Sequence, residues 1–304
     1  MHSENRRILV TGSSGFIGSK LVQKLLSMEH EVIGLDIVRS ICDDENFKHF
    51  SVDFTDKNEL LSLFDLVKPD VCYHVGAIAD LNFARKHPAK TVEVNVMGTA
   101  NLVEACKKHD ILLNYVSTCC VYGNTTQHPT TEDAPKNPTE IYGQTKLAGE
   151  CILLGYHQLY GMPFNIVRPS TVYGEGMRPA LAVYIFLTKA MKGEIIPIHG
   201  TGKQTRSFIY IDDLIDGMVK VLERSRNQVI NLAGAQEISV IQLAHKCYEV
   251  CEREPNFEFV EDRKGQVMKE QISIEKAKNL FSWRPIVDFD IGLKKTLEWL
   301  NKKN

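Results

Sequence analysis

The chain has 304 residues, of which 43% are hydrophobic and 24% charged, with a formal net charge of -2. This balance is ordinary for a globular protein and predicts no basic surface for nucleic acid or for an anionic membrane. No stretch approaches the roughly 18 apolar residues of a membrane span, and the N-terminal residues show no secretory segment. The eight cysteines follow no framework spacing, so we expect reduced thiols, no metal site and a cytoplasmic location.

The first half of the chain alternates apolar strand-like runs with helical patterns. The runs are RILVTG, EVIGLD, HFSVD, DVCYHV, ILLNYVST and FNIVRP, and the helices are predicted near residues 15–27, 57–65, 89–109 and 140–160. Apolar runs with little alternation, separated by helices, are typical of a parallel sheet that is covered on both faces. We therefore predict an α/β fold with a doubly wound parallel sheet in residues 1–169.

After residue 169 the alternation weakens. Helices are predicted near residues 180–191, 212–224 and 240–251 and at the C-terminus, whereas IHGTGKQTRSF is interpreted as a loop. Strands such as VINLAG return to the sheet, which predicts that about 207–233 rejoins the first domain. Residues 170–304 are expected to form mainly a smaller, interleaved substrate-binding part, without a flexible linker or a repeat.

A glycine-rich turn follows the first predicted strand. In TGSSGFIG, Gly12, Gly15 and Gly18 precede an apolar helix, and Asp36 ends the second strand eighteen residues after the last glycine. Glycines let the amides at a helix N-terminus approach a pyrophosphate, where the helix dipole favours negative charge. An acidic residue at the end of the second strand accepts hydrogen bonds from the adenosine ribose and repels a 2′-phosphate. The pattern predicts a dinucleotide site that prefers NAD to NADP.

A second pattern, IYGQTKLAGE, places Tyr142 and Lys146 four residues apart on one face of a predicted helix. Pro135 and Pro138 lie just upstream, where the helix begins. A lysine ammonium near a phenol favours the phenolate and lowers the pKa of the phenol from about 10 toward neutrality. Tyr142 is therefore predicted to act as a base.

These motifs in their order resemble the extended short-chain dehydrogenase/reductase family, specifically its NAD-dependent nucleotide-sugar epimerases and dehydratases. The resemblance extends through VSTCCVYG, VDFTD, HVGAIA, VNVMGT, VRPSTVYGEG, GTGKQTRSFIYIDD and DRKGQ, and so covers nearly the whole chain. It implies a Rossmann-like fold, NAD as cofactor, a nucleotide diphosphate sugar as substrate and a homodimer. The cofactor contacts that it implies are Gly12, Gly15, Phe16, Ile17, Gly18, Asp36, Asp53, Val75, Asn95, Tyr142 and Lys146.

The resemblance also implies a catalytic triad of Thr118, Tyr142 and Lys146. Tyr142 would take the proton from the sugar hydroxyl at carbon 4 while hydride passes to NAD, with Thr118 bonded to the same oxygen. A 4-keto sugar results, and its reduction from the other face makes 4-epimerisation the simplest outcome. The residues implied in substrate binding are Thr118, Thr171, Arg178, Arg206 and Arg263. Among these, Arg206 and Arg263 would bind the diphosphate, since a guanidinium matches phosphate oxygens bidentately.

Two adjacent cysteines leave the reaction open. Cys119 and Cys120 stand where the family's 4,6-dehydratases carry an Asp-Glu pair, and a thiol with a pKa of about 8.5 is the poorer acid. Cys120 also occupies the place of an acid/base cysteine in GDP-fucose synthase and GDP-mannose 3,5-epimerase. The alternatives are therefore a cysteine-assisted dehydratase or a 3/5-epimerase that uses Cys120, with Cys119, as acid/base, and a dehydrogenase that releases NADH. The cysteines could equally pack as small apolar residues that shape the sugar pocket.

The helix that carries the tyrosine and lysine has a further apolar stripe, formed by Leu147, Ala148, Cys151 and Leu154. In the resembling family the helices near 89–109 and 140–160 pair in a dimer, and the stripe is consistent with such an interface. Burial within one chain explains the same pattern. The motifs specify neither the nucleotide nor the sugar.

Overall fold

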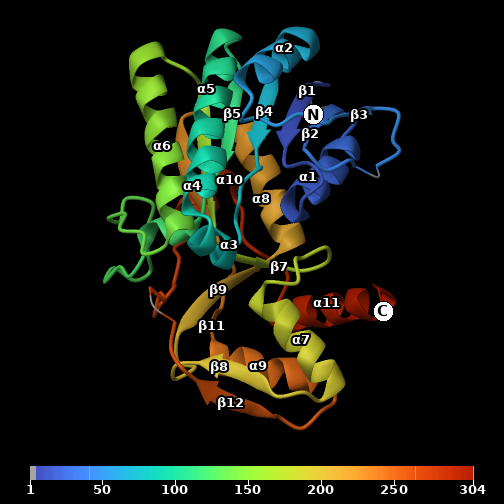
Figure 1. Ribbon diagram of the computed structural model, residues 1–304, viewed down its shortest axis with the longest axis vertical. Coiled ribbons are helices and arrows are strands. Elements are labelled where there is room, and N and C mark those ends of the chain that lie inside the picture. Colours follow the sequence, from blue (N-terminus) through green and yellow to red (C-terminus); the bar gives the residue numbers. More distant parts are fainter. Residues whose placement is uncertain (1–4, 41, 264, 304) are drawn as a thin grey trace. The chain divides into compact units, whose positions relative to one another are not determined.

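The computed structural model describes residues 5–40, 42–263 and 265–303 (Figure 1). The chain divides into two compact units, each assembled from separate stretches of sequence. The first unit comprises Met1–Val121, Glu140–Arg168 and Met218–Ile230, and the second comprises Tyr122–Thr139, Pro169–Gly217 and Asn231–Asn304. The chain therefore passes between the two units several times.

A seven-stranded parallel sheet is the centre of the first unit, with the order β10-β6-β5-β4-β1-β2-β3. Its strands are β1 (Arg7–Thr11), β2 (Glu31–Leu35), β3 (Phe47–Phe50), β4 (Val71–His74), β5 (Leu112–Val116), β6 (Phe164–Pro169) and β10 (Gln228–Leu232). In the register of β1, Ile8 lies opposite Val32 on one side and Val71 on the other. The sheet confirms the predicted doubly wound α/β fold.

The strand order changes direction between β1 and β4. From β1 the chain first adds β2 and β3 on one side and then returns to add β4, β5 and β6 on the other. In open parallel sheets, ligands bind beyond the carboxyl ends of the strands at such a switch point, because the loops there diverge to opposite faces. The glycine-rich turn follows β1 at this position.

Helices cover the sheet of the first unit. They are α1 (Phe16–Leu26), α2 (Lys57–Val67), α3 (Leu81–Lys86), α4 (Pro88–Val92), the π-helix η1 (Glu93–Met97), α5 (Gly98–Lys108) and α6 (Ile141–Tyr160). The neighbours α2, α5 and α6 contact one another in that order, and α5 and α6 run side by side in Figure 1. Apolar residues of these helices, such as Phe64, Leu102 and Leu153, pack with sheet residues in one buried cluster.

The prediction of a single regular helix near residues 89–109 is wrong in its middle part. The segment is helical throughout, but its middle five residues, Glu93–Met97, wind as a π-helix between α4 and α5. A π turn accommodates one extra residue and is common at functional sites. The amphipathic pattern of the sequence gives no sign of it, because the helix continues on both sides.

The second unit contains smaller sheets and further helices, and two helical elements, Cys119–Tyr122 and Ile211–Arg224, have residues in both units. One sheet has the order β11-β9-β7, built from β7 (Thr171–Tyr173), β9 (Thr205–Tyr210) and β11 (Glu237–Ser239), and the other pairs β8 (Ile196–His199) with β12 (Phe257–Val260). The remaining helical elements are η2 (Cys119–Tyr122), α7 (Ala182–Lys192), α8 (Ile211–Arg224), α9 (Val240–Val250), α10 (Glu275–Phe281) and α11 (Phe289–Lys303). Among the described helices, none combines the length and the apolarity that crossing a membrane requires.

The interpretation of IHGTGKQTRSF as a loop is wrong. The segment contains the end of β8 and the beginning of β9. β9 pairs with β11 on one side and with β7 on the other, so its backbone hydrogen bonds are supplied by strands that are distant in sequence. Arg206 consequently lies in a strand rather than in a loop.

Candidate active site

The turn after β1 depends on close approaches between backbone segments. Gly12 has a φ of +66°, which L-residues rarely adopt, and its amide donates to the carbonyl of Leu35 at 2.8 Å. A Cβ on Gly18 would lie 2.0 Å from the carbonyl oxygen of Gly12, and one on Gly12 would lie 2.6 Å from the Cα of Gly76. The turn thus packs directly against helix α1 and against the loop that begins with Val75 after β4.

The N-terminus of α1 fits the pyrophosphate of NAD. Gly15 caps this helix, and no side chain among the described residues caps it by a hydrogen bond, which leaves the first N–H groups available. The predicted contacts Phe16 and Ile17 form the first turn. A Cβ on Gly15 would meet only the carbonyl oxygen of Gly12, at 3.2 Å, among the described atoms. A phosphate can therefore approach the backbone here, where the helix dipole favours an anion.

Asp36 lies beside this turn. Its Oδ2 accepts a hydrogen bond from the Ser14 amide, and its Oδ1 accepts one from the Val38 amide, both at 3.0 Å. The carboxylate is thereby held at the end of β2, next to the turn after β1, and it keeps lone pairs for ribose hydroxyls. These residues fit the adenosine half of the cofactor.

Two other predicted cofactor contacts are engaged with protein groups. Asn95, in the π-helix, donates through Nδ2 to the carbonyl of Ile78 at 2.9 Å and to Oγ1 of Thr145 at 3.0 Å, and its Oδ1 accepts from the Ile78 amide at 2.8 Å. Both amide hydrogens are thus in use, and the side chain joins the loop after β4 to α6. Asp53 accepts from the amide and hydroxyl of Thr55 at 2.9 and 2.8 Å, which forms the turn before α2.

The tyrosine and lysine lie one turn apart at the start of α6. Tyr142 is half-buried, whereas Lys146 is only 1% exposed. The Lys146 ammonium lies over the ring of Tyr115, 4.0 Å from its centroid, and the Tyr115 hydroxyl donates to the Lys146 carbonyl at 3.2 Å. Burial lowers the pKa of Lys146 to about 7, against the opposing effect of the Glu150 carboxylate. At neutral pH this lysine is therefore poised between its two charge states.

Thr118 and the two cysteines follow the end of β5. Thr118 is buried, and its Oγ1 accepts a hydrogen bond from the Cys120 amide at 3.2 Å. Cys119 is also buried, and its thiol donates to the carbonyl of Arg168 at 3.3 Å. Cys120 is half-buried. The two thiols therefore differ: one is bonded to the backbone of β6, and the other is partly accessible.

A buried histidine links these segments and was not predicted as a site residue. His74 bonds Oγ1 of Thr11 through Nδ1 at 2.8 Å and Oγ1 of Thr99 through Nε2 at 2.9 Å. Because Thr99 donates its own hydrogen to the carbonyl of Asn95 at 2.6 Å, it accepts from Nε2. Burial, and to a smaller extent Lys146, holds the pKa of His74 well below its ordinary value, so the ring is neutral.

Another unpredicted group lies on α6 itself. Glu150 forms a buried ion pair with Arg168, whose Nη2 and Nε lie 2.6 and 2.9 Å from its carboxylate oxygens. The Ser117 hydroxyl donates to the same carboxylate at 2.5 Å. Two sequence signals exist in hindsight: Glu150 follows Lys146 by four residues, and Arg168 is a charge in an otherwise apolar strand.

Two of the predicted substrate-binding residues in the second unit interact with a buried glutamate. Thr171 and Arg206 both act on the carboxyl group of Glu270, whose pKa is raised by burial and lowered in part by the Arg206 charge. The Arg206 Nη1 also donates to the carbonyls of Thr205 and Val267, at 2.7 Å each. Arg178 is half-buried and Arg263 is exposed. Glu270 itself was not predicted, because no local pattern distinguishes it from a surface glutamate.

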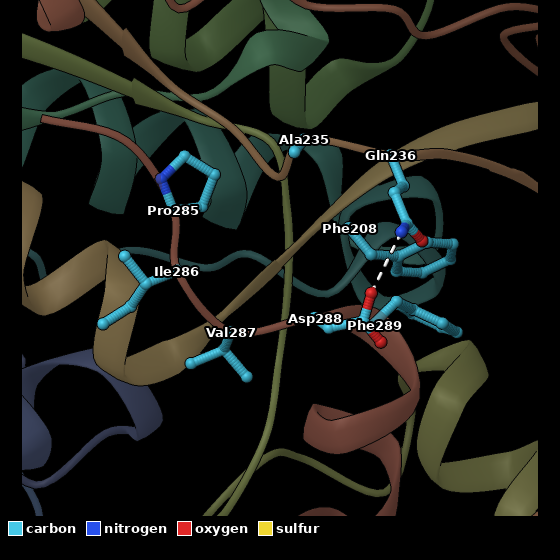
Figure 2. Close-up of a pocket in the computed structure, with 8 residues that line it drawn as sticks. All are labelled: Phe208, Ala235, Gln236, Pro285, Ile286, Val287, Asp288 and Phe289. Atoms are coloured by element: carbon cyan, nitrogen blue, oxygen red, sulfur yellow. Dashed lines mark hydrogen bonds between the residues drawn. The ribbon is translucent and has the colours of Figure 1, made fainter.

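The second unit also has a pocket of about 210 Å³ (Figure 2). Gln236 donates to Asp288 across it at 3.0 Å, and the other side chains shown are largely apolar. Its lining residues are Phe208, Ala235, Gln236, Pro285, Ile286, Val287, Asp288 and Phe289. None of these residues was predicted as part of the site, and the chemistry of the lining offers no proton relay.

The fold and the glycine-rich turn define a dinucleotide-binding α/β protein. A family model described as the NAD dependent epimerase/dehydratase family matches residues 8–233, and the chain belongs to this family. The protein is accordingly an NAD-dependent enzyme of the epimerase/dehydratase group, within the extended short-chain dehydrogenase/reductases.

Similar proteins within this family carry different activities. The chain is 32% identical to a putative UDP-glucose 4-epimerase of Methanocaldococcus jannaschii, over 98% of this chain and 99% of that protein. It is 33% identical to the dTDP-D-glucose 4,6-dehydratase of Bos taurus, over 97% and 88%. The UDP-glucuronic acid 4-epimerase of Bacillus cereus, solved with UDP-glucuronic acid and NAD, superposes with a TM-score of 0.92 at 30% identity, over 98% and 100%. Overall similarity therefore does not distinguish an epimerase from a dehydratase. The distinction has to be argued from the side chains of the site.

Proposed function

We propose that the protein is an NAD-dependent UDP-sugar 4-epimerase that works through a transient 4-keto sugar. The observation that carries the proposal is the state of Cys119: its thiol is buried and bonded to the Arg168 carbonyl. The family's 4,6-dehydratases are expected to have an acidic pair at Cys119 and Cys120. A buried thiol that already donates to the backbone is poorly suited to protonate a departing hydroxide. Oxidation and reduction at carbon 4 need no such group.

Tyr142 is the proposed base. It takes the proton from the hydroxyl at carbon 4 and returns the proton to the same oxygen when the ketone is reduced. Lys146, one turn further along α6, stabilises the phenolate by its charge. Thr118 holds the sugar oxygen by a hydrogen bond, since its hydroxyl can donate while its oxygen accepts from the Cys120 amide. NAD, which the turn after β1 and Asp36 would hold, would supply the hydride acceptor and donor for carbon 4.

The arginines of the second unit are the proposed ligands of the diphosphate. Arg206 is held in strand β9 by two carbonyl oxygens, which orients its guanidinium before a substrate arrives. Arg178, Arg263 and Thr171 are proposed as further contacts of the nucleotide sugar. The UDP group is chosen because UDP-sugars are named for several of the similar proteins.

The proposal is tested by incubating the purified protein in deuterated water with UDP-glucose, UDP-glucuronic acid, UDP-N-acetylglucosamine and dTDP-glucose. We expect one of the UDP-sugars to be converted into its carbon-4 epimer, without deuterium in the sugar ring and without net release of NADH. Tyr142→Phe should lower kcat at least about 100-fold in a protein that still binds NAD. Loss of one water from the product would reject the proposal, and so would full activity of Tyr142→Phe.

A second candidate is epimerisation at carbon 3 or 5 with Cys120 as acid/base. This candidate is favoured by Cys120, which is half-buried. Its amide donates a hydrogen bond to the hydroxyl of Thr118, the residue proposed to bind the sugar oxygen. A thiol has a pKa close enough to the working pH for reversible proton abstraction beside a ketone. Deuterium at carbon 3 or 5 in the same experiment, abolished by Cys120→Ser, would replace the first candidate by this one.

We further propose that the enzyme is a homodimer that pairs through α5 and α6. Part of the apolar stripe of α6 is accessible in the single chain: Cys151 is exposed and Leu154 is 38% exposed, whereas Leu147 and Ala148 are half-buried. Burial within the chain therefore does not account for Cys151 and Leu154. An apolar surface of this kind is typical of a contact with another protein.

A further inference from the structure

Glu150 connects the catalytic helix to the strand end that carries Thr118. It lies on α6 one turn after Lys146 and is 1% exposed. Its carboxylate accepts a hydrogen bond from Ser117, the residue before Thr118, at 2.5 Å, and a bidentate pair from Arg168 at the end of β6. Three elements of the first unit, α6, β5 and β6, are thereby joined at one buried carboxylate.

The same carboxylate supplies the negative charge nearest to Lys146 on its own helix. Burial in the apolar interior disfavours the ammonium, and Glu150 opposes this effect. The other titratable groups that face this region are Tyr115 from β5, whose pKa burial raises, and His74 from β4, which is neutral. Arg168 adds a second buried cation. Glu150 is thus paired with Arg168 and acts on Lys146 through its charge, so its removal would affect both cations.

We propose that Glu150 is a positioning residue of the active site: its carboxylate ties α6 to the segment carrying Thr118 and keeps the shared proton on Lys146 rather than on Tyr142. This inference rests on the proposed function, in which Tyr142 is the base. The productive state of the pair is a phenolate beside an ammonium. Its unproductive tautomer, a phenol beside a neutral amine, carries the same net charge.

The two tautomers respond differently to a charge on α6. Because Lys146 is one turn from Glu150 and Tyr142 is two turns away, the carboxylate stabilises the ammonium more than it destabilises the phenolate. Neutralising it therefore moves the shared proton from lysine to tyrosine. It also lets the pair release its first proton at lower pH, because a neighbouring negative charge has been removed. In the variant, the Tyr142–Lys146 pair therefore loses its first proton at lower pH, but a smaller share of the ionised pair carries the phenolate that acts as base.

The experiment compares pH profiles of kcat/KM for the wild type and Glu150→Gln, which retains the shape of the side chain but removes its charge and one of its two acceptor oxygens. We expect the plateau to fall about tenfold or more and the acid limb to move down by about one pH unit. Ser117→Ala removes the hydrogen bond from Ser117 to Glu150 but leaves the Glu150 charge. The plateau of kcat/KM should therefore fall, while the acid limb of the profile should stay at its wild-type pH. Glu104→Gln removes an exposed carboxylate on α5 that pairs with Lys57, and it should change neither.

Glu150→Gln leaves Arg168 buried without its partner, which endangers folding. The double variant Glu150→Gln/Arg168→Met removes the ion pair as a whole and should fold, since apolar replacement of a buried pair is often tolerated. The Glu150 carboxylate raises the pKa of Lys146, and Arg168→Met removes a cation as well, so the double variant should show a downward shift of the limb that is smaller than in Glu150→Gln. A limb at the wild-type position in folded protein of both variants would overturn the inference.

A second measurement does not depend on turnover. The titration of Lys146 is followed by NMR in protein labelled with ¹⁵N-lysine, and the resonance is assigned by its loss in Lys146→Met. We expect the midpoint to lie lower in Glu150→Gln than in the wild type, and in the double variant between these two. An unchanged midpoint would refute the inference even in an active enzyme. A shifted midpoint in a protein that converts no nucleotide sugar would instead contradict the proposed function alone.

Discussion

Gly149 on α6 is a position at which one methyl group should disturb both stability and the site. A Cβ there would lie 2.2 Å from the hydroxyl oxygen of Tyr115 and 2.8 Å from its Cζ, well inside normal contact distance. Tyr115 is fully buried, so its ring can move only by displacing its neighbours. Its ring also supports the Lys146 ammonium at 4.0 Å. Gly149→Ala should therefore act on the core and on the lysine together.

The expected free-energy change of unfolding follows from three contributions. Overpacking of a filled core costs about 1–3 kcal/mol, and loss of the Tyr115 hydrogen bond to the Lys146 carbonyl costs about 1 kcal/mol. The gain from replacing glycine by alanine within a helix is about 1 kcal/mol. The net effect is a destabilisation of roughly 1–3 kcal/mol, which corresponds to a fall in Tm of roughly 2–5 °C for a chain of this length.

Gly155 on the same helix is the matched control. A Cβ at this position meets none of the described atoms within 4 Å, so Gly155→Ala should gain about 0.5–1 kcal/mol from helix propensity alone. Urea and thermal unfolding of the cofactor-free proteins measure both variants, and kcat should fall only in Gly149→Ala. The reasoning would be refuted if Gly149→Ala were as stable as Gly155→Ala.

Other expectations concern the cofactor, the lysine and the dimer. Asp36→Asn should raise the affinity for NADP about tenfold and weaken NAD binding, because the carboxylate that repels a 2′-phosphate is gone; fluorescence titration measures both, and an unchanged preference would contradict the assigned role. Lys146→Met should stop turnover yet stabilise the cofactor-free protein by up to about 4 kcal/mol at pH 7. The unfolded lysine binds a proton up to its ordinary pKa of 10.5 and the folded one only to about 7, so wild-type stability falls as the pH drops from about 10 to 7. The advantage of the variant in urea unfolding should grow over that range and level off below it, whereas a constant difference would disprove the assignment. Leu154→Arg should convert the proposed dimer into a monomer in light scattering, and an unaltered mass would locate the interface elsewhere.

The sheet could be predicted because its signals are local. Apolar runs buried on both faces and the spacing of Gly12, Gly15 and Gly18 each depend on a few consecutive residues. The same is true of Tyr142 and Lys146, whose spacing directly encodes a shared helix face. Where these residues lie in space is then fixed by the topology of a parallel sheet.

Other features depend on contacts between distant segments and have no local signature. β9 is a strand because β7 and β11 pair with it, although its residues lie among glycines that favour loops. Arg168 signals that some buried acid must exist, but only the packed structure identifies Glu150 as that acid. The bonds of Asn95 to Ile78 and Thr145 likewise join three segments that no sequence window contains.

The π-helix around Asn95 gives this stretch one residue more than a regular α-helix needs between α4 and α5. Deleting one residue of Glu93–Met97 would let the backbone return to regular α-helical winding. Because a π turn holds its extra residue within about the same rotation, α5 would keep its orientation relative to α4, and Leu102 and Val103 would stay buried. The side chains of the turn itself would change direction, and the bonds of Asn95 to Ile78 and Thr145 would be lost. The irregular turn therefore serves the placement of Asn95, and a shortened helix could remain folded without that link.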